Sequence, residues 1–97
     1  MNKKMKNMQE IDEDTIIEFP CQFPIKAMGI AEDDFDILVV GIIRKHVTDL
    51  SENAVKSRLS KEGKYISITV HVEAESKQQL DNIYLELTAH EKVLWAL

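Results

Sequence analysis

Residues 65–72 alternate between apolar and polar side chains with a period of two. In a β-strand this spacing places Ile66, Ile68, Val70 and Val72 on one face and the polar residues on the other. A strand of this kind packs one face against a core, while its other face meets solvent or a binding partner. The alternation therefore predicts a sheet with one open face, which is the main candidate for a binding surface.

Three further segments predict strands, because they carry extended or alternating apolar patterns between turn-forming residues. We expect these strands at residues 22–30, 54–60 and 93–97. Residues 60–64 predict a hairpin turn into the central strand, in which Gly63 supplies the left-handed conformation.

Two segments carry apolar residues at helical spacing. The first predicts a helix to about His46, with acids in its first turn, Asp33 or Asp34 as its cap, and cations at its end. The second begins with a capping-box signature, Ser76 followed by Gln79, and predicts a helix that ends near His90.

The order strand, helix, strand, strand, helix, strand predicts an α+β fold, the ferredoxin-like βαββαβ split motif. Right-handed crossovers place both helices on one face of a four-stranded antiparallel sheet with the spatial order 4-1-3-2. We assign this domain to residues 15–97 and interpret residues 1–14 as a flexible polar tail. The predicted core contains the aliphatic and aromatic residues that this arrangement turns toward the helices: Ile25, Ala27, Phe35, Leu38, Val39, Ile42, Ile43, Val55, Leu59, Ile66, Ile68, Val70, Val72, Leu80, Ile83, Leu87 and Val93 or Leu94.

The composition narrows the classes of partner and the compartment. The chain has 17 acidic and 12 basic residues and a net charge of −5, which argues against nucleic-acid binding. One cysteine, Cys21, rules out an intramolecular disulfide and favours a reducing compartment. No apolar run approaches the roughly 20 residues that span a bilayer, and the first residues lead into acids rather than into the apolar stretch of a secretory signal. We expect a cytoplasmic protein that binds neither nucleic acid nor membrane.

The open face of the predicted sheet collects polar, cationic and a few apolar side chains, and we expect it to bind a protein partner or a second copy of the chain. Lys56 and Arg58 have a second interpretation, since cations on an edge strand discourage pairing with another chain. Trp95 is either a core residue, which we favour, or an anchor for a partner. The candidate binding residues on this face are Lys26, Met28, Lys56, Arg58, Tyr65, Ser67, Thr69 and His71.

The sequence carries no recognisable motif for catalysis or for binding a metal or cofactor. RNA recognition on such a sheet needs several stacked aromatics, and only Tyr65 qualifies. Metal chaperones of this shape need a Cys-x-x-Cys pair, and this chain has one cysteine. Phosphohydrolases of this shape need an anion-binding loop after the first strand, whereas the loop here, residues 29–34, is acidic and would repel phosphate. His46 and His90 are interpreted as helix-end residues, and Cys21 as an inert thiol. We predict a non-enzymatic protein without a metal or cofactor.

Six short sequence stretches together indicate a family: EFPC at residues 18–21, FPIKAMG at 23–29, GKY at 63–65, SITV at 67–70, residues 83–87, and residues 93–97. Together they resemble the YbeD-like family of small bacterial cytoplasmic proteins of unknown function, across about residues 16–97. Ala27 departs mildly from that family, in which a larger valine is common at this position.

The resemblance implies a fold similar to the ACT regulatory domains, which bind amino acids in metabolic enzymes, and a regulatory link to lipoate metabolism. It implies no catalytic residues. ACT domains place a glycine at the end of the first strand beside their ligand, and Gly29 is similar to that glycine. The alternative function is therefore an ACT-type sensor of a small, amino-acid-like molecule, with the ligand near Gly29, Ile30 and the start of the first helix.

Overall fold

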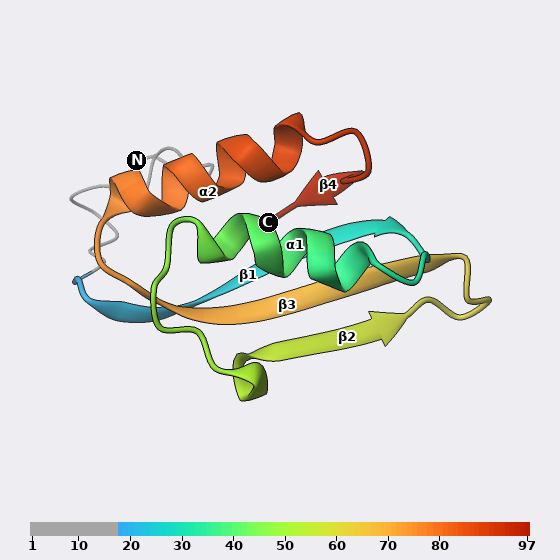
Figure 1. Ribbon diagram of the computed structural model, residues 1–97, viewed down its shortest axis with the longest axis horizontal. Coiled ribbons are helices and arrows are strands. Elements are labelled where there is room, and N and C mark those ends of the chain that lie inside the picture. The colour runs from blue at the N-terminus through green and yellow to red at the C-terminus, as the bar shows by residue number, and fades with distance from the viewer. Residues whose placement is uncertain (1–17) are drawn as a thin grey trace, which may run out of the picture.

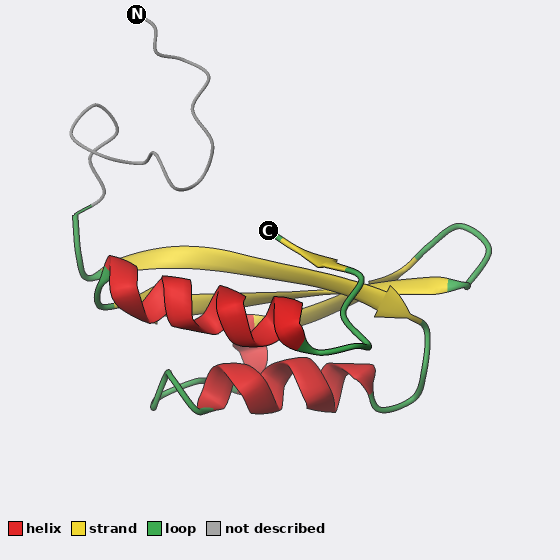
Figure 2. Cartoon of the chain, turned by 90° about the horizontal axis from the view of Figure 1, so that it is seen from above, coloured by secondary structure: helices red, strands yellow, loops and turns green. Residues whose placement is uncertain are grey.

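The computed structural model describes residues 18–97, apart from the side chain of Glu52, so the predicted tail at residues 1–14 lies outside the described residues. The elements, in chain order, are β1 (Cys21–Ile30), α1 (Phe35–Arg44), the short 3₁₀ helix η2 (Glu52–Ala54), β2 (Val55–Leu59), β3 (Tyr65–Ala74), α2 (Lys77–Ala89) and β4 (Trp95–Ala96). The four strands form one sheet in the order β2-β3-β1-β4, which is the predicted order 4-1-3-2 read from the other edge. Both helices, α1 and α2, lie on the same side of this sheet (Figures 1 and 2).

The antiparallel pair of β1 and β3 forms the centre of the sheet, with an unbroken register from Cys21 opposite Ala74 to Ile30 opposite Tyr65. The N–H and C=O groups of Lys26 bond to Leu97, on the side of β1 away from β3. The backbone nitrogen and carbonyl of Pro24, two residues earlier, point to the same side of β1, beyond the end of the short β4. A proline is tolerated there because its missing N–H is not needed for the ladder with β3.

The two helices begin differently. Ser76 caps α2 as predicted, since its side chain accepts a hydrogen bond from the backbone N–H of Gln79 at 3.1 Å. The Gln79 side chain accepts from the N–H of Glu75 and donates to the carbonyl of His46, and so joins the start of α2 to the end of α1. Asp34 occupies the N-cap position of α1, but its side chain makes no capping hydrogen bond. The helix ends at Arg44 rather than at His46.

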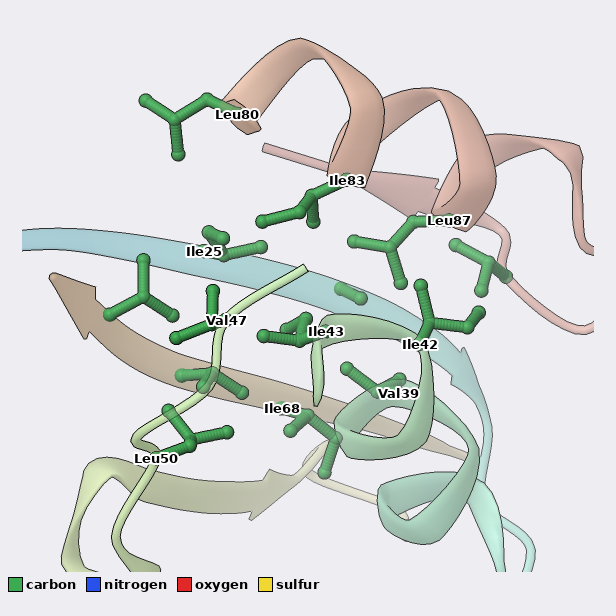
Figure 3. Packing of buried hydrophobic residues seen from close by; sticks show 14 of the residues in the cluster. Ile25, Val39, Ile42, Ile43, Val47, Leu50, Ile68, Leu80, Ile83 and Leu87 are labelled. Atoms are coloured by element: carbon green, nitrogen blue, oxygen red, sulfur yellow. The ribbon is translucent and has the colours of Figure 1, made fainter. Parts of the chain in front are cut away.

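The core lies between the sheet and the helices (Figure 3). Ile25 and Ile68 from the sheet meet Ile43 and Ile83 from the helices, and all four are fully buried. The core also includes Val47, Leu50 and Ala74, which were not among the predicted core residues. Val47 and Leu50 lie in the connection between α1 and η2.

Three predicted core residues, Leu38, Val55 and Ile66, are only partly buried and pack against the core, and two further predictions are wrong or half right. Leu59 is 58 % exposed, because β2 is an edge strand and neither helix lies over it in Figure 1. Of the pair Val93 or Leu94, Val93 is buried and Leu94 is 52 % exposed. The hairpin prediction is confirmed, since Gly63 has a φ of 75°.

Candidate functional site: the open face of the sheet

The sheet surface opposite the helices, here called the open face, carries side chains from all four strands. No helix of the described chain lies on this side of the sheet (Figure 2). Because side chains alternate along each strand, the register fixes which residues share this face. All eight predicted binding residues lie on it. Its members are Gln22, Pro24, Lys26, Met28, Ile30, Lys56, Arg58, Tyr65, Ser67, Thr69, His71, Glu73, Trp95 and Leu97.

The centre of the open face is built from two rows of residues that run across the strands. In the first row, Lys26 and Lys56 lie on either side of Thr69. Neighbouring strands are about 4.8 Å apart, so the Cα atoms of these two lysines lie about 10 Å from each other. In the second row, Met28 and Arg58 lie on either side of Ser67. The short hydroxyl side chains of β3 are thus flanked by longer side chains on both sides.

Apolar side chains gather where β4 joins the sheet. Trp95 pairs with Met28, and Leu97 lies beside Lys26. Trp95 is 37 % exposed, Ile30 44 % and Leu97 65 %. The preference for a buried Trp95 is therefore wrong: the register with Met28 turns its indole to the open face, whereas the next residue in β4 faces the core.

The charges on the open face differ in sign from the charge of the whole chain. The strands place three cations there, Lys26, Lys56 and Arg58, against one carboxylate, Glu73, which lies near the far end of β3. Within residues 18–97 none of these three cations forms a salt bridge; the pairs there involve Lys45, His46, Lys77 and Lys92. The Lys64 ammonium adds positive charge near the apolar side chains at the end of β1. Its Nζ lies 5.6 Å from the centroid of the ring of Tyr65, which pairs with Ile30.

The residues of the alternative ligand site, Gly29 and Ile30, face opposite sides of the sheet. Gly29 is buried on the core side, under the ring of Phe35. Ile30 belongs to the open face. At the start of α1, the Glu32 carboxylate is already paired with the Lys92 ammonium at 2.8 Å. The structure therefore does not bring Gly29 and Ile30 together around a common cavity.

A group of charges that the sequence did not suggest joins α1 to α2. The Glu86 carboxylate accepts hydrogen bonds from Lys45 and pairs with His46, whose Nε2 lies 2.9 Å from Glu86 Oε1. The hydrogen bond from Lys45, followed by that from His46, lowers the pKa of Glu86 below its usual value. His46 was interpreted only as a helix-end residue; its partner is 40 positions away in the chain.

His90, the other predicted helix-end histidine, accepts a hydrogen bond at its Nδ1 from the backbone N–H of Lys92 at 3.1 Å. Across the described part of the chain, no group of three or more His, Cys, Asp or Glu side chains is arranged to hold a metal ion. None of the helices in residues 18–97 has the length and apolar character needed to cross a membrane.

Comparison with known proteins places the chain among small bacterial proteins. Residues 14–97 match the family model "Protein of unknown function (DUF493)". A UPF0250 protein of Chromobacterium violaceum is 46 % identical over 82 residues, which cover 84 % of this chain and 92 % of the relative. A UPF0250 protein of Janthinobacterium sp. is 40 % identical over 91 residues, which cover 93 % of this chain and the whole relative.

A similar fold is found among solved structures. The solution structure of protein HP0495 from H. pylori superimposes with a TM-score of 0.67 at 17 % sequence identity, and the match covers 96 % of this chain and 98 % of that one. At this identity the likeness supports the fold alone. The match of the family model to residues 14–97, together with the relatives at 40–46 % identity, shows that this chain belongs to the DUF493 (UPF0250, YbeD-like) family of proteins of unknown function.

Proposed function

We propose that this protein is a non-enzymatic regulatory module that binds a protein partner through the open face of its sheet. The observation that carries the proposal is the exposure of Trp95, Ile30 and Leu97 on a surface that the helices of the described chain leave uncovered. Exposed apolar side chains that lie together and are bordered by charged ones are typical of interaction surfaces. Tryptophan and arginine are also the residues that most often dominate binding energy in such surfaces, and the open face holds one of each.

The chemistry of the open face supports binding rather than catalysis. Ser67 and Thr69 are the hydroxyls at its centre, and a nucleophilic hydroxyl needs a base within hydrogen-bond reach. Their cross-strand neighbours are cations or Met28, which do not accept a proton. His71, the one imidazole on the face, makes no side-chain hydrogen bond to either hydroxyl in the described structure. From the resemblance to the YbeD-like family, we further propose that the protein acts in the cytoplasm and that its regulatory role is linked to lipoate metabolism.

The test is affinity capture from cell extract with the full chain and three variants. Lys26→Glu and Lys56→Glu reverse charges at the centre of the open face, while Lys61→Glu makes the same change in the hairpin turn, away from that face. We expect wild type and Lys61→Glu to retain one common partner that both open-face variants lose. Identical capture by all four proteins would refute the proposal, and so would capture of nothing by the folded wild type.

The alternative is an ACT-type sensor of an amino-acid-like molecule near Gly29 and Ile30. Its support is weaker, because the Phe35 ring covers Gly29 and the acids of residues 32–34 oppose a ligand carboxylate. A thermal-shift screen of amino acids and lipoate-related compounds decides this alternative. A ligand at 100 times its dissociation constant adds about 2.7 kcal/mol to the free energy of unfolding. If no compound raises the melting temperature, the hypothesis of a sensor function is refuted.

A further inference from the structure

We infer that the segment recognised by the open face is acidic, and that it carries carboxylates close to apolar side chains. This inference rests on the proposed function and names the chemistry of the partner. Lys26, Lys56 and Arg58 lie within two adjacent rows of the sheet and form no salt bridge within residues 18–97. An occupant of this area therefore gains most if it brings carboxylates to the three cations.

The apolar end of the open face sets the second requirement. Met28 lies two residues beyond Lys26 on β1, and Trp95 lies beside Met28 on β4. Residues two apart on a strand are separated by about 6.6 Å, so one partner segment reaches both the cationic rows and the indole. A purely acidic segment would leave Trp95 and Ile30 in water, and a purely apolar one would bury the lysines without partners. The two areas together select a segment of mixed character.

The open face of a second copy of this chain does not meet these requirements. Two open faces packed about a two-fold axis through their centres would bring Lys26, Lys56 and Arg58 of both copies together, and Glu73, the one side-chain carboxylate of each face, lies near the far end of β3. Like charges placed opposite each other in an interface oppose association. The outer edge of β1 beyond β4 carries Pro24, whose missing N–H discourages the addition of another strand. The charge pattern therefore disfavours an interface made by two open faces.

The probe for the test is a fluorescently labelled synthetic peptide with the sequence EIDEDTIIE, which is that of residues 10–18 and combines five acids with three isoleucines. The control peptide, QINQNTIIQ, replaces each acid with its amide. Binding to the full-length protein is measured by fluorescence anisotropy. We expect the acidic peptide to bind at least about tenfold more tightly than the control, with an affinity that falls as salt is added.

Variants of the full chain assign the binding to the open face. Lys26→Glu combined with Lys56→Glu, and separately Trp95→Ala, are each expected to weaken binding of the acidic peptide at least about tenfold, whereas Lys61→Glu leaves it unchanged. If Trp95→Ala unfolds the protein, the lysine variants still decide the question, because their side chains are exposed. Equal binding of the two peptides, or unchanged binding by the lysine variants, would overturn the inference.

Three further outcomes separate other occupants from an acidic partner. Binding that appears only after Glu10, Asp12, Glu13 and Asp14 are replaced by amides in the full chain would show that the chain's own acidic segment fills the face, against the inference. A dimer in sedimentation that Lys26→Glu dissociates, but that the acidic peptide does not displace, would show that the open face of a second copy fills it, also against the inference. Capture of a protein that depends on Lys26 but that the acidic peptide does not displace would overturn the acidic chemistry while keeping the proposed function.

Discussion

The replacement Gly29→Ala tests how the end of β1 packs against the helix side of the sheet. A Cβ atom at this position would lie 2.5 Å from Cε1 and 2.7 Å from Cζ of Phe35, and 2.6 Å from the backbone carbonyl oxygen of Lys92. Phe35 is only 1 % exposed, so its ring has little room to move away. The carbonyl of Lys92 belongs to the segment between α2 and β4, and it moves only if that segment shifts. The φ of Gly29 is not positive, so its backbone conformation does not require glycine. Glycine is required here because neighbouring atoms leave no room for a Cβ atom.

The size of the effect follows from two opposing contributions. Replacing glycine by alanine within a strand stabilises the fold by about 0.5–1 kcal/mol, because the unfolded chain loses freedom. Overpacking a filled core destabilises it by about 1–3 kcal/mol, and contact with a backbone carbonyl places this site in the upper part of that range. The net change is a loss of roughly 1–2.5 kcal/mol in the free energy of unfolding. For a domain of this size we expect the melting temperature to fall by roughly 4–20 °C.

Gly41→Ala is the matched control. Gly41 is exposed on α1, and an added Cβ would meet no atom within 4 Å. Alanine is a better helix former than glycine, so this variant is expected to gain about 0.5–1 kcal/mol. Both variants are compared with wild type by urea and thermal unfolding, followed by circular dichroism. The reasoning is refuted if Gly29→Ala unfolds with the wild-type midpoint, or if Gly41→Ala loses as much stability as Gly29→Ala.

Three further predictions concern single side chains. The Tyr84 hydroxyl is buried without a hydrogen-bond partner in residues 18–97, and burial raises its pKa to about 12, so Tyr84→Phe should stabilise the protein by about 1 kcal/mol in urea titrations. The folded state favours the neutral phenol; wild type should therefore lose stability as the pH rises from about 10 toward 12, and an equal loss in the variant would count against this. Lys45 and His46 lower the pKa of Glu86, so Glu86 contributes stability at neutral pH that is lost as the pH falls through its folded-state pKa. Thermal unfolding should therefore show that Glu86→Gln is less stable than wild type at pH 7 and differs little from it near pH 2. Ser76→Ala removes the cap that accepts from Gln79 N–H and should lower the free energy of unfolding by about 1 kcal/mol, whereas an unchanged urea midpoint would show that the cap contributes nothing.

The parts of the fold that the sequence predicted well are those fixed by local pattern. The alternation of β3 determined which residues face the core, since a shift of one position would turn Ile68 and Val70 outward. Ser76 and Gln79 marked the start of α2 because the cap is made by residues three apart. The same period of two correctly placed all eight predicted binding residues on the open face.

The errors occur where burial depends on elements distant in sequence. Leu59 has the spacing of a core residue, but it lies on an edge strand that the helices do not cover. Trp95 belongs to a strand of only two residues, too short for a period to show, so its face became known only from its pairing with Met28. The contacts of Glu86 with Lys45 and His46 join positions about 40 apart, and no local pattern reports such a pair.

The most direct test of the open face as an uncovered binding surface uses the intrinsic fluorescence of Trp95, the single tryptophan of the chain. Its indole lies on the open face near Lys26, so in the free full-length protein we predict efficient collisional quenching by iodide and weaker quenching by caesium, whose positive charge the neighbouring cations repel. Addition of the captured partner should then protect the indole from iodide. Quenching in the free protein as slight as that of a fully buried tryptophan, with no difference between the two ions, would contradict the account.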